Sequence, residues 1–178
     1  IGEQIMSGSI ADNAGRASGV IAAAAGGGGK VLQVLQSVKN DTATTSSTSF
    51  EAVSGMSVSI TPSATDSKIL VLWNLNGMGN TGGSSIQILR DSTELCIGDA
   101  DGSRVRVTGC IYAADTNTFE NVAGQFLDED HGSTSALSYA VHWRTHGAAN
   151  YMNRCNSDPD SADGPRTAST ITVMEIGA

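Results

Sequence analysis

The sequence predicts an all-β protein, an antiparallel β-sandwich with jelly-roll-like architecture and about nine to eleven short strands. From Lys30 onward, apolar and polar residues alternate with a period of two, as in 55–60 and 68–75. Clusters of Gly, Asn, Asp, Ser and Thr interrupt this alternation at intervals of about eight to twelve residues, which is typical of turns between strands. No helical periodicity of convincing length occurs after residue 30.

The 178 residues divide at a run of four glycines, residues 26–29. Segment 1–29 is rich in small residues and shows no alternation. We therefore expect it to be an N-terminal arm or linker that is flexible or becomes ordered on assembly. Residues 30–178 have the length of one ordinary domain, and we expect them to form the β-sandwich head domain.

The first strands are expected between residues 30 and 53. The segment "KVLQVLQSVK" places Leu32, Val34 and Val38 on one face of a strand. A short second strand is expected around Phe50 and Val53.

Two longer strands are expected at 55–61 and 68–76. The turn at Pro62 is expected to join them as an antiparallel pair, because proline cannot donate a ladder hydrogen bond and the Ser, Thr and Asp side chains suit a turn. The run "KILVLWNL" is almost continuously apolar, so it predicts a central strand with Trp73 pointing inward.

The remaining strands follow the same pattern. They are expected in the segments "SSIQILRD", "ELCIGD", "SRVRVTGCIY", "VAGQFLD", "SALSYAVHWRT", "NYMNR" and "STITVMEI". Tyr139 and Trp143 lie on an apolar face and are expected in the core. Arg104 and Arg106 alternate with valines and are expected to face solvent from a strand.

Composition disfavours several classes of partner. Only 16% of the residues are charged, the formal net charge is -8, and the pI is near 4.6. Such a surface repels a phosphate backbone, so nucleic-acid binding is disfavoured. Adsorption to anionic membranes is disfavoured for the same reason. No stretch reaches the roughly 18 apolar residues that a membrane-spanning helix needs, so no membrane insertion is expected.

The three cysteines, Cys96, Cys110 and Cys155, form no CxxC pair. Their odd number and wide spacing favour buried free thiols. One bridge such as Cys96–Cys110, and ligation of a metal, remain alternatives.

Histidines and acidic loops are the other candidate metal ligands. His131, His142 and His146 are expected to be exposed strand and loop residues rather than a metal site. A weak candidate for calcium is the acidic loop near the C-terminus, with Asp158, Asp160 and Asp163 as its carboxylates. The spacing does not match the helix–loop–helix calcium motif, so solvated carboxylates are favoured and no cofactor is predicted.

No catalytic motif occurs in the chain: GxSxG, HExxH, SxxK and GxxxxGK[ST] are all absent. We therefore expect no enzymatic activity, although two loops could still bring a pair of carboxylates together. A ligand is instead expected at the loops 77–85, 112–120, 128–134 and 156–167. Its contacts are expected to be polar or aromatic residues in or near those loops: Asn80, Tyr112, Asn117, Tyr151 and Asn156.

Several segments, taken in order, resemble a known family. They are "GGGKVLQVLQSVKNDT", "SITPSATDSKILVLWNLN", "ILRDSTELCIGDADGSRVR" and the closing "STITVMEI". Together they resemble a C-terminal domain of virion structural proteins from tailed bacteriophages, particularly marine ones, over about residues 28–177. The resemblance implies an all-β, homotrimeric head at the end of a tail fibre or other virion appendage, with no catalytic residues to carry over.

The expected function is therefore that of a non-enzymatic virion protein on the surface of the extracellular particle. It would be a tail-fibre or appendage head whose loops attach to a host-surface glycan or other receptor. Its partners would be further copies of itself, other virion proteins and that glycan. The alternative is a capsid decoration or filament-forming subunit without receptor binding. A depolymerase or esterase acting on host polysaccharide is a third possibility.

Overall fold

The computed structural model describes residues 29–77, 82–112 and 118–178, and all regular structure within them is β-strand. The expected N-terminal arm, apart from Gly29, lies outside the described residues. None of the described segments forms a helix long and apolar enough to cross a lipid bilayer. The eleven strands are β1 (Val31–Lys39), β2 (Ala43–Thr45), β3 (Glu51–Ile60), β4 (Lys68–Asn76), β5 (Ser84–Arg90), β6 (Thr93–Leu95), β7 (Gly109–Ile111), β8 (Asn121–Asp128), β9 (Leu137–Thr145), β10 (Asn150–Met152) and β11 (Ser169–Ile176).

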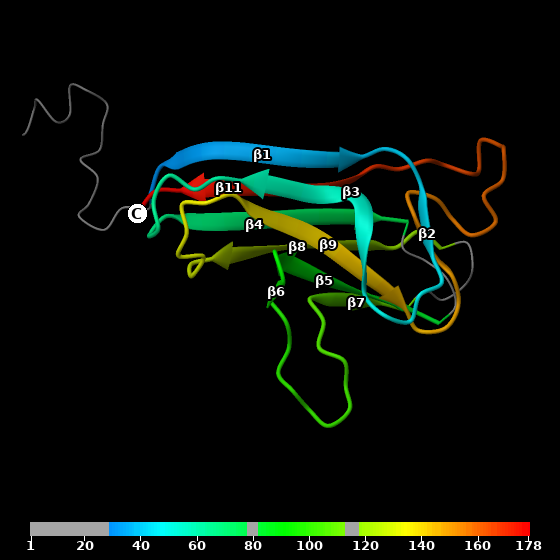
Figure 1. Cartoon of the computed structure of the whole chain (residues 1–178). Helices are drawn as coiled ribbons and strands as arrows, with labels where there is room; N and C mark the ends of the chain where they lie inside the picture. Colours follow the sequence, from blue (N-terminus) through cyan, green and yellow to red (C-terminus); the bar gives the residue numbers. More distant parts are fainter. Residues whose placement is uncertain (1–28, 78–81, 113–117) are drawn as a thin grey trace, which may run out of the picture.

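The strands form two antiparallel sheets that pack face to face (Figure 1). Sheet 1 has the order β1-β11-β4-β8. Sheet 2 has the order β3-β9-β5, and both β6 and β7 pair with the remaining edge of β5. A separate small pair, β2 with β10, lies at one end of the sandwich (Figure 1).

The connectivity is that of a jelly roll, which confirms the predicted fold class. Without the short strands β2, β6 and β10, eight strands remain. The first of these pairs with the last (β1 with β11), the second with the seventh (β3 with β9), the third with the sixth (β4 with β8) and the fourth with the fifth (β5 with β7). The chain is thus one long hairpin folded into two sheets.

The core lies between the sheets and contains the three aromatic residues expected there. Trp73, Tyr139 and Trp143 are all buried. They point inward because every second residue of β4 and β9 faces the opposite sheet. Burying each large apolar side chain stabilises the fold by about 1.5–3 kcal/mol.

The expected antiparallel pair around Pro62 is wrong. β3 pairs with β9 in sheet 2, whereas β4 pairs with β11 and β8 in sheet 1, so the connection through Pro62 crosses from one sheet to the other. Alternation in two successive strands indicates that each has one buried face, but it does not say which strand lies beside which.

Two other expectations about strands are corrected. Residues 103–107 form a loop between β6 and β7, so Arg104 and Arg106 face solvent from a loop. In β1, Val34 and Val38 do share a face, but it points away from the core, and Leu32 lies at a bulge. Alternation alone cannot distinguish an inward from an outward apolar face.

The two ends of the sandwich differ. At the terminal end, the Gly177 N–H donates to the Lys30 carbonyl (2.9 Å), so the start of β1 and the end of β11 lie together. At the opposite end, which we call the loop end, lie β2, β10 and the loop 156–167 (Figure 1). The long loop between β6 and β7 projects from the side of the sandwich instead (Figure 1).

Candidate functional site

The loop end carries an exposed pair of rings, Tyr112 and His146. β5 lies between β7 and β9, and its first residue, Ser84, pairs with Ile111 at the end of β7 and with Thr145 at the end of β9. The residues that follow these two strands therefore emerge together. The ring centroids are 5.5 Å apart with an interplanar angle of 56°, and Tyr112 is 71% exposed.

Hydrogen bonds from neighbouring residues hold the His146 ring in place. Its Nε2 atom lies 2.7 Å from Ser85 Oγ, and its backbone N–H donates to the Gly83 carbonyl at 3.1 Å. Gly83 has a φ of 84°, and a Cβ there would lie 2.9 Å from His146 Nδ1 and from the Ile111 carbonyl oxygen. Only glycine suits this position, because other residues would be strained and would displace the ring.

A second aromatic residue of the loop end, Tyr151, carries a cation on one face of its ring. The Arg154 guanidinium lies 4.0 Å from the ring centroid. Arg154 is held there by hydrogen bonds to the Thr44 hydroxyl (3.2 Å) and to the Cys155 and Asn156 carbonyls (3.1 and 3.3 Å). This fixes the direction of the chain where it leaves β10 and enters the loop 156–167.

The structure brings three of the five predicted contact residues to the loop end: Tyr112, Tyr151 and Asn156. Asn80 and Asn117 lie outside the described residues. The predicted contact turn 128–134 lies elsewhere. It follows β8 at the terminal end, where Asp128 pairs with Ile69, next to the start of β4.

The sequence analysis missed three supporting residues at the loop end, namely His146, Ser85 and Arg154. His146 and Ser85 are 61 residues apart, and no local pattern relates them. Only the pairing of β5 with β9 places them together. Arg154 follows Tyr151 by three residues, and this short spacing was the one available signal.

In the acidic loop near the C-terminus, one of the three candidate carboxylates is already paired with arginine. Asp158 forms an ion pair with Arg166 and lies 3.7 Å from Arg154. Asp160 and Asp163 are exposed. Among the described residues, no group of three or more His, Cys, Asp or Glu side chains is placed to hold a metal ion.

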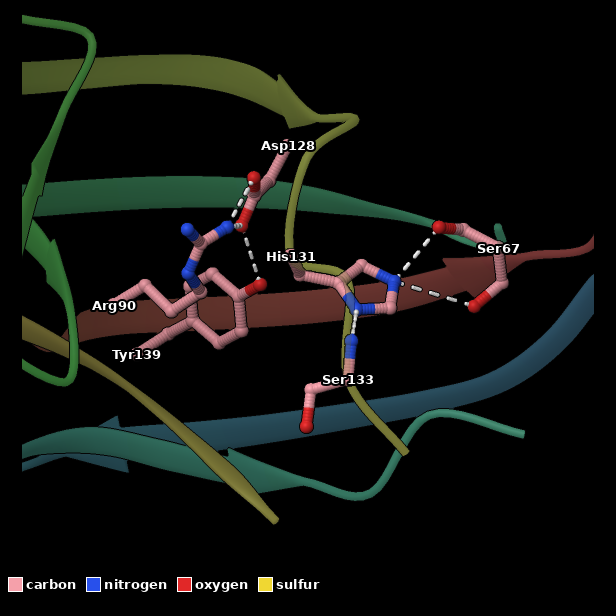
Figure 2. A network of polar contacts seen from close by, with 6 residues as sticks. All are labelled: Ser67, Arg90, Asp128, His131, Ser133 and Tyr139. Atoms are coloured by element: carbon pink, nitrogen blue, oxygen red, sulfur yellow. Dashed lines mark hydrogen bonds and ion pairs between the residues drawn. The ribbon is translucent and has the colours of Figure 1, made fainter. Parts of the chain in front are cut away.

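A buried polar cluster lies between the sheets near the terminal end (Figure 2). Asp128, the last residue of β8, accepts hydrogen bonds from Arg90 Nη1 at both carboxylate oxygens (2.6 Å each) and from the Tyr139 hydroxyl (2.7 Å). Burial, followed by the hydrogen bond to Asp128, raises the pKa of Tyr139 well above its ordinary value. Burial alone would lower the pKa of Arg90, but the contact with Asp128 raises it. Tyr139 and Arg90 therefore keep their protons, and the three side chains together act as an internal clamp.

His131 is buried, which corrects the expectation that it is an exposed loop residue. Its Nε2 atom lies 2.7 Å from the Ser67 carbonyl oxygen and 3.4 Å from Ser67 Oγ, and its Nδ1 accepts from the Ser133 N–H at 3.2 Å (Figure 2). The carbonyl takes the Nε2 proton, so this nitrogen cannot act as a base toward the Ser67 hydroxyl. The pair ties two turns together, the one after β8 and the one before β4.

Glu175 is a second buried acid, and it fixes the connection through Pro62. Its carboxylate accepts hydrogen bonds from the Ser63 N–H (2.7 Å), the Ser63 hydroxyl (2.6 Å) and Gln33 Nε2 (2.6 Å). Burial opposes ionisation, but these hydrogen bonds outweigh it and lower the pKa of Glu175 to about 2.

The three cysteines are free thiols, as expected. Only Cys155 is buried, whereas Cys96 and Cys110 are exposed. The expectation of burial is therefore wrong for two of the three. Cys96 follows β6 and Cys110 lies in β7, the two short strands that share one edge of β5.

Comparison with protein-family models and with curated proteins found no match to the chain. The buried acids and His131 are saturated by internal hydrogen bonds, whereas the loop end offers an exposed ring, supported by neighbouring side chains, to an external partner.

Proposed function

We propose that the chain is a non-enzymatic structural module of a tailed-bacteriophage virion, the head of a tail fibre or other surface appendage. Its loop end would contact a glycan or another receptor on the host surface. The resemblance of the sequence to phage virion proteins supplies the biological setting of this proposal. The ligand class follows from the chemistry of the loop end.

One observation carries the proposal: the residues that begin and end the β-sandwich lie at the opposite end from the exposed ring of Tyr112. The Lys30–Gly177 hydrogen bond places the beginning and the end of the head domain at the terminal end. Tyr112 directly follows β7 and Tyr151 lies in β10, so both are at the loop end. A domain tethered by its termini would therefore point its exposed aromatic residues outward.

The exposed ring of Tyr112 suits a sugar. An aromatic ring presents a flat apolar face that packs on the C–H face of a pyranose, and its hydroxyl can hydrogen-bond to the sugar's own hydroxyls. The contact with His146 limits the rotamers of Tyr112, so less side-chain entropy is lost on binding. Such single contacts are weak, and several copies on one particle would raise the avidity.

The test is binding of the full chain to a panel of purified bacterial surface polysaccharides and outer-membrane vesicles. We expect Tyr112→Ala to weaken binding by roughly threefold to tenfold per site, the amount that loss of one aromatic contact implies. The matched control is Val105→Ala. Val105 is 52% exposed, but it lies in the side loop between β6 and β7.

Equal binding by Tyr112→Ala and the wild type would place the ligand elsewhere. A protein that binds none of the panel would favour the alternative role, a capsid decoration or filament subunit. Release of reducing ends or acetate from the polysaccharides would contradict a non-enzymatic role.

A further inference from the structure

The outward-facing surfaces of the two sheets have opposite character. On sheet 2 the outward positions are mostly polar, and the apolar ones include Ala52, Leu89 and Ala140. They include Ser57, Ser59, Gln87, Ser138, His142 and Arg144. This is the usual pattern for a sheet with one face in water. Sheet 1 departs from it.

A row of apolar residues crosses the outer face of sheet 1 on all four strands. Register places Val34, Met174, Leu70 and Leu127 in one row from β1 to β8. Leu72 lies in the next row and Val38 in the row beyond it, and the other members of these two rows are polar apart from Ala123. Val34 and Val38, on the edge strand, are 52% and 49% exposed, and Leu127, on the opposite edge strand, is 37% exposed. Monomeric proteins rarely expose a continuous apolar patch that spans a whole sheet.

Five of the polar side chains on this face are already hydrogen-bonded to one another. Gln36 Nε2 donates to Thr172 Oγ1 at 2.8 Å, across the pair β1–β11. Asn121 donates to the side chains of Asn74 and Asn76 across the pair β8–β4. Burying a polar group costs little when it keeps its hydrogen bond, so covering these five side chains carries no large desolvation penalty.

The face also carries almost no net charge, although the chain as a whole has a formal net charge of -8. Among the outward positions of its four strands, Lys68 is the one charged residue, and it is ion-paired with Glu129 at the end of the face. Identical acidic chains repel one another over most of their surface. They can approach most closely through a neutral, apolar face.

The dimensions of the face fit a specific contact. Four strands spaced about 4.8 Å apart and eight residues rising about 3.3 Å each give roughly 500 Å² of flat area, before side-chain relief is added. A standard interface buries about 800 Å² per partner. Association would therefore have to cover most of the face rather than one corner of it.

We infer that the outer face of sheet 1 is the surface through which copies of this chain associate. The partner is a second copy, because a neutral face on an acidic chain can pack against the same face of another copy without charge repulsion. Recognition of a different protein through its charge would require charged residues on this face. Association of copies does not depend on the proposed function. Only its consequence, a higher avidity for a receptor, rests on that function. Association aligned along this face would leave the loop end free.

The test is the mass of the full-length protein in solution, measured by light scattering over a range of concentrations. The wild type is expected to exceed the chain mass of 18.2 kDa. Val34→Glu and Leu127→Glu place a charge on the face and are expected to shift the protein to the monomer mass. The matched control is Val105→Glu, because Val105 has the same 52% exposure as Val34 but lies in the side loop.

Circular dichroism identifies any variant that fails to fold, and the other face variant then decides the outcome. A wild type that remains monomeric at every concentration would overturn the inference. The face would then be left uncovered, or be covered by residues 1–28 or by another protein. Oligomers that persist in a folded face variant would overturn it too. Loss of glycan binding alone would contradict only the proposed function, since the mass measurement does not depend on a ligand.

Discussion

Asp128 and Glu175 are buried acids with different surroundings, and each holds a different pair of segments together. Asp128 is neutralised by Arg90 and joins β8 of sheet 1 to β5 and β9 of sheet 2. Glu175 has no cation in its described hydrogen-bonding shell and is held by donors from Ser63 and Gln33. An anion that depends on hydrogen bonds in this way makes folding sensitive to acid.

The first prediction therefore concerns the pH dependence of stability. The pKa of Glu175 is about 2 in the folded protein, below its ordinary value of 4.5. Its stabilising effect is fully present above pH 4.5 and is lost as the pH falls toward 2. We expect the free energy of unfolding of the wild type, measured by denaturant titration, to decrease through this range. In Glu175→Gln this part of the decrease should be missing.

The matched control for this prediction is Glu129→Gln, because Glu129 is exposed and its ion pair lies in solvent. It should keep the acid-dependent decrease of the wild type. If Glu175→Gln and the wild type show the same decrease, the stabilisation of the Glu175 carboxylate is smaller than its hydrogen bonds indicate.

At the scale of elements, the sequence predicted the strands better than their neighbours. The prediction that Trp73 points inward from β4 was correct, because the alternation of the strand and its flanking turn residues agree. The connection after β3 was misassigned because Pro62 marks a turn in either case, and only long-range pairing shows that this turn crosses between sheets. The local sequence also could not show which side of β1 faces outward, since this depends on which face of sheet 1 packs against sheet 2.

The candidate site shows the same limit. Tyr112 and Tyr151 could be predicted as surface residues because they stand near strand ends. The support of His146 by Ser85 could not, since it arises from the pairing of β9 with β5. Burial of His131 was missed because an acidic turn usually lies in solvent, whereas here Ser67 and Ser133 satisfy both ring nitrogens.

The second prediction concerns the pairing of β4 with β8. Gly124 lies opposite Trp73, and a Cβ at residue 124 would lie 2.4 Å from Trp73 Cζ2 and 2.8 Å from Cε2. We expect Gly124→Ala to destabilise the fold by about 1–3 kcal/mol in urea unfolding, because the indole must move within a packed core. Gly98→Ala is the control, since an added Cβ there meets no atom within 4 Å, and it should change stability by less than about 0.5 kcal/mol.

A double-mutant cycle separates this overlap from a general intolerance of β8 to substitution. Trp73→Leu replaces the indole by a smaller side chain and should by itself lower the free energy of unfolding. Combined with Gly124→Ala, its effect should be smaller than the sum of the two single effects, because the overlap no longer exists. Strict additivity would mean that residue 124 does not act through Trp73.

At the scale of the whole molecule, the surfaces of the jelly roll differ in chemical character. The terminal end is tied by the Lys30–Gly177 hydrogen bond and the loop end carries the exposed rings. The outer face of sheet 1 carries an apolar row across its four strands, whereas that of sheet 2 is mostly polar. Copies that associate through sheet 1 leave their loop ends uncovered, and where their strands run the same way, the loop ends point in a shared direction. Such an array would let weak contacts act together.

The third prediction follows from this arrangement. If copies associate through the outer face of sheet 1, unfolding is coupled to dissociation, and the unfolding midpoint should rise with protein concentration. For a dimer, the apparent free energy of unfolding should increase by about 1.4 kcal/mol per tenfold increase in concentration. Val34→Glu should unfold at a midpoint independent of concentration, whereas Val105→Glu should behave as the wild type does. A wild-type midpoint that stays constant between about 1 and 100 µM would show that the apolar face does not hold copies together in this range.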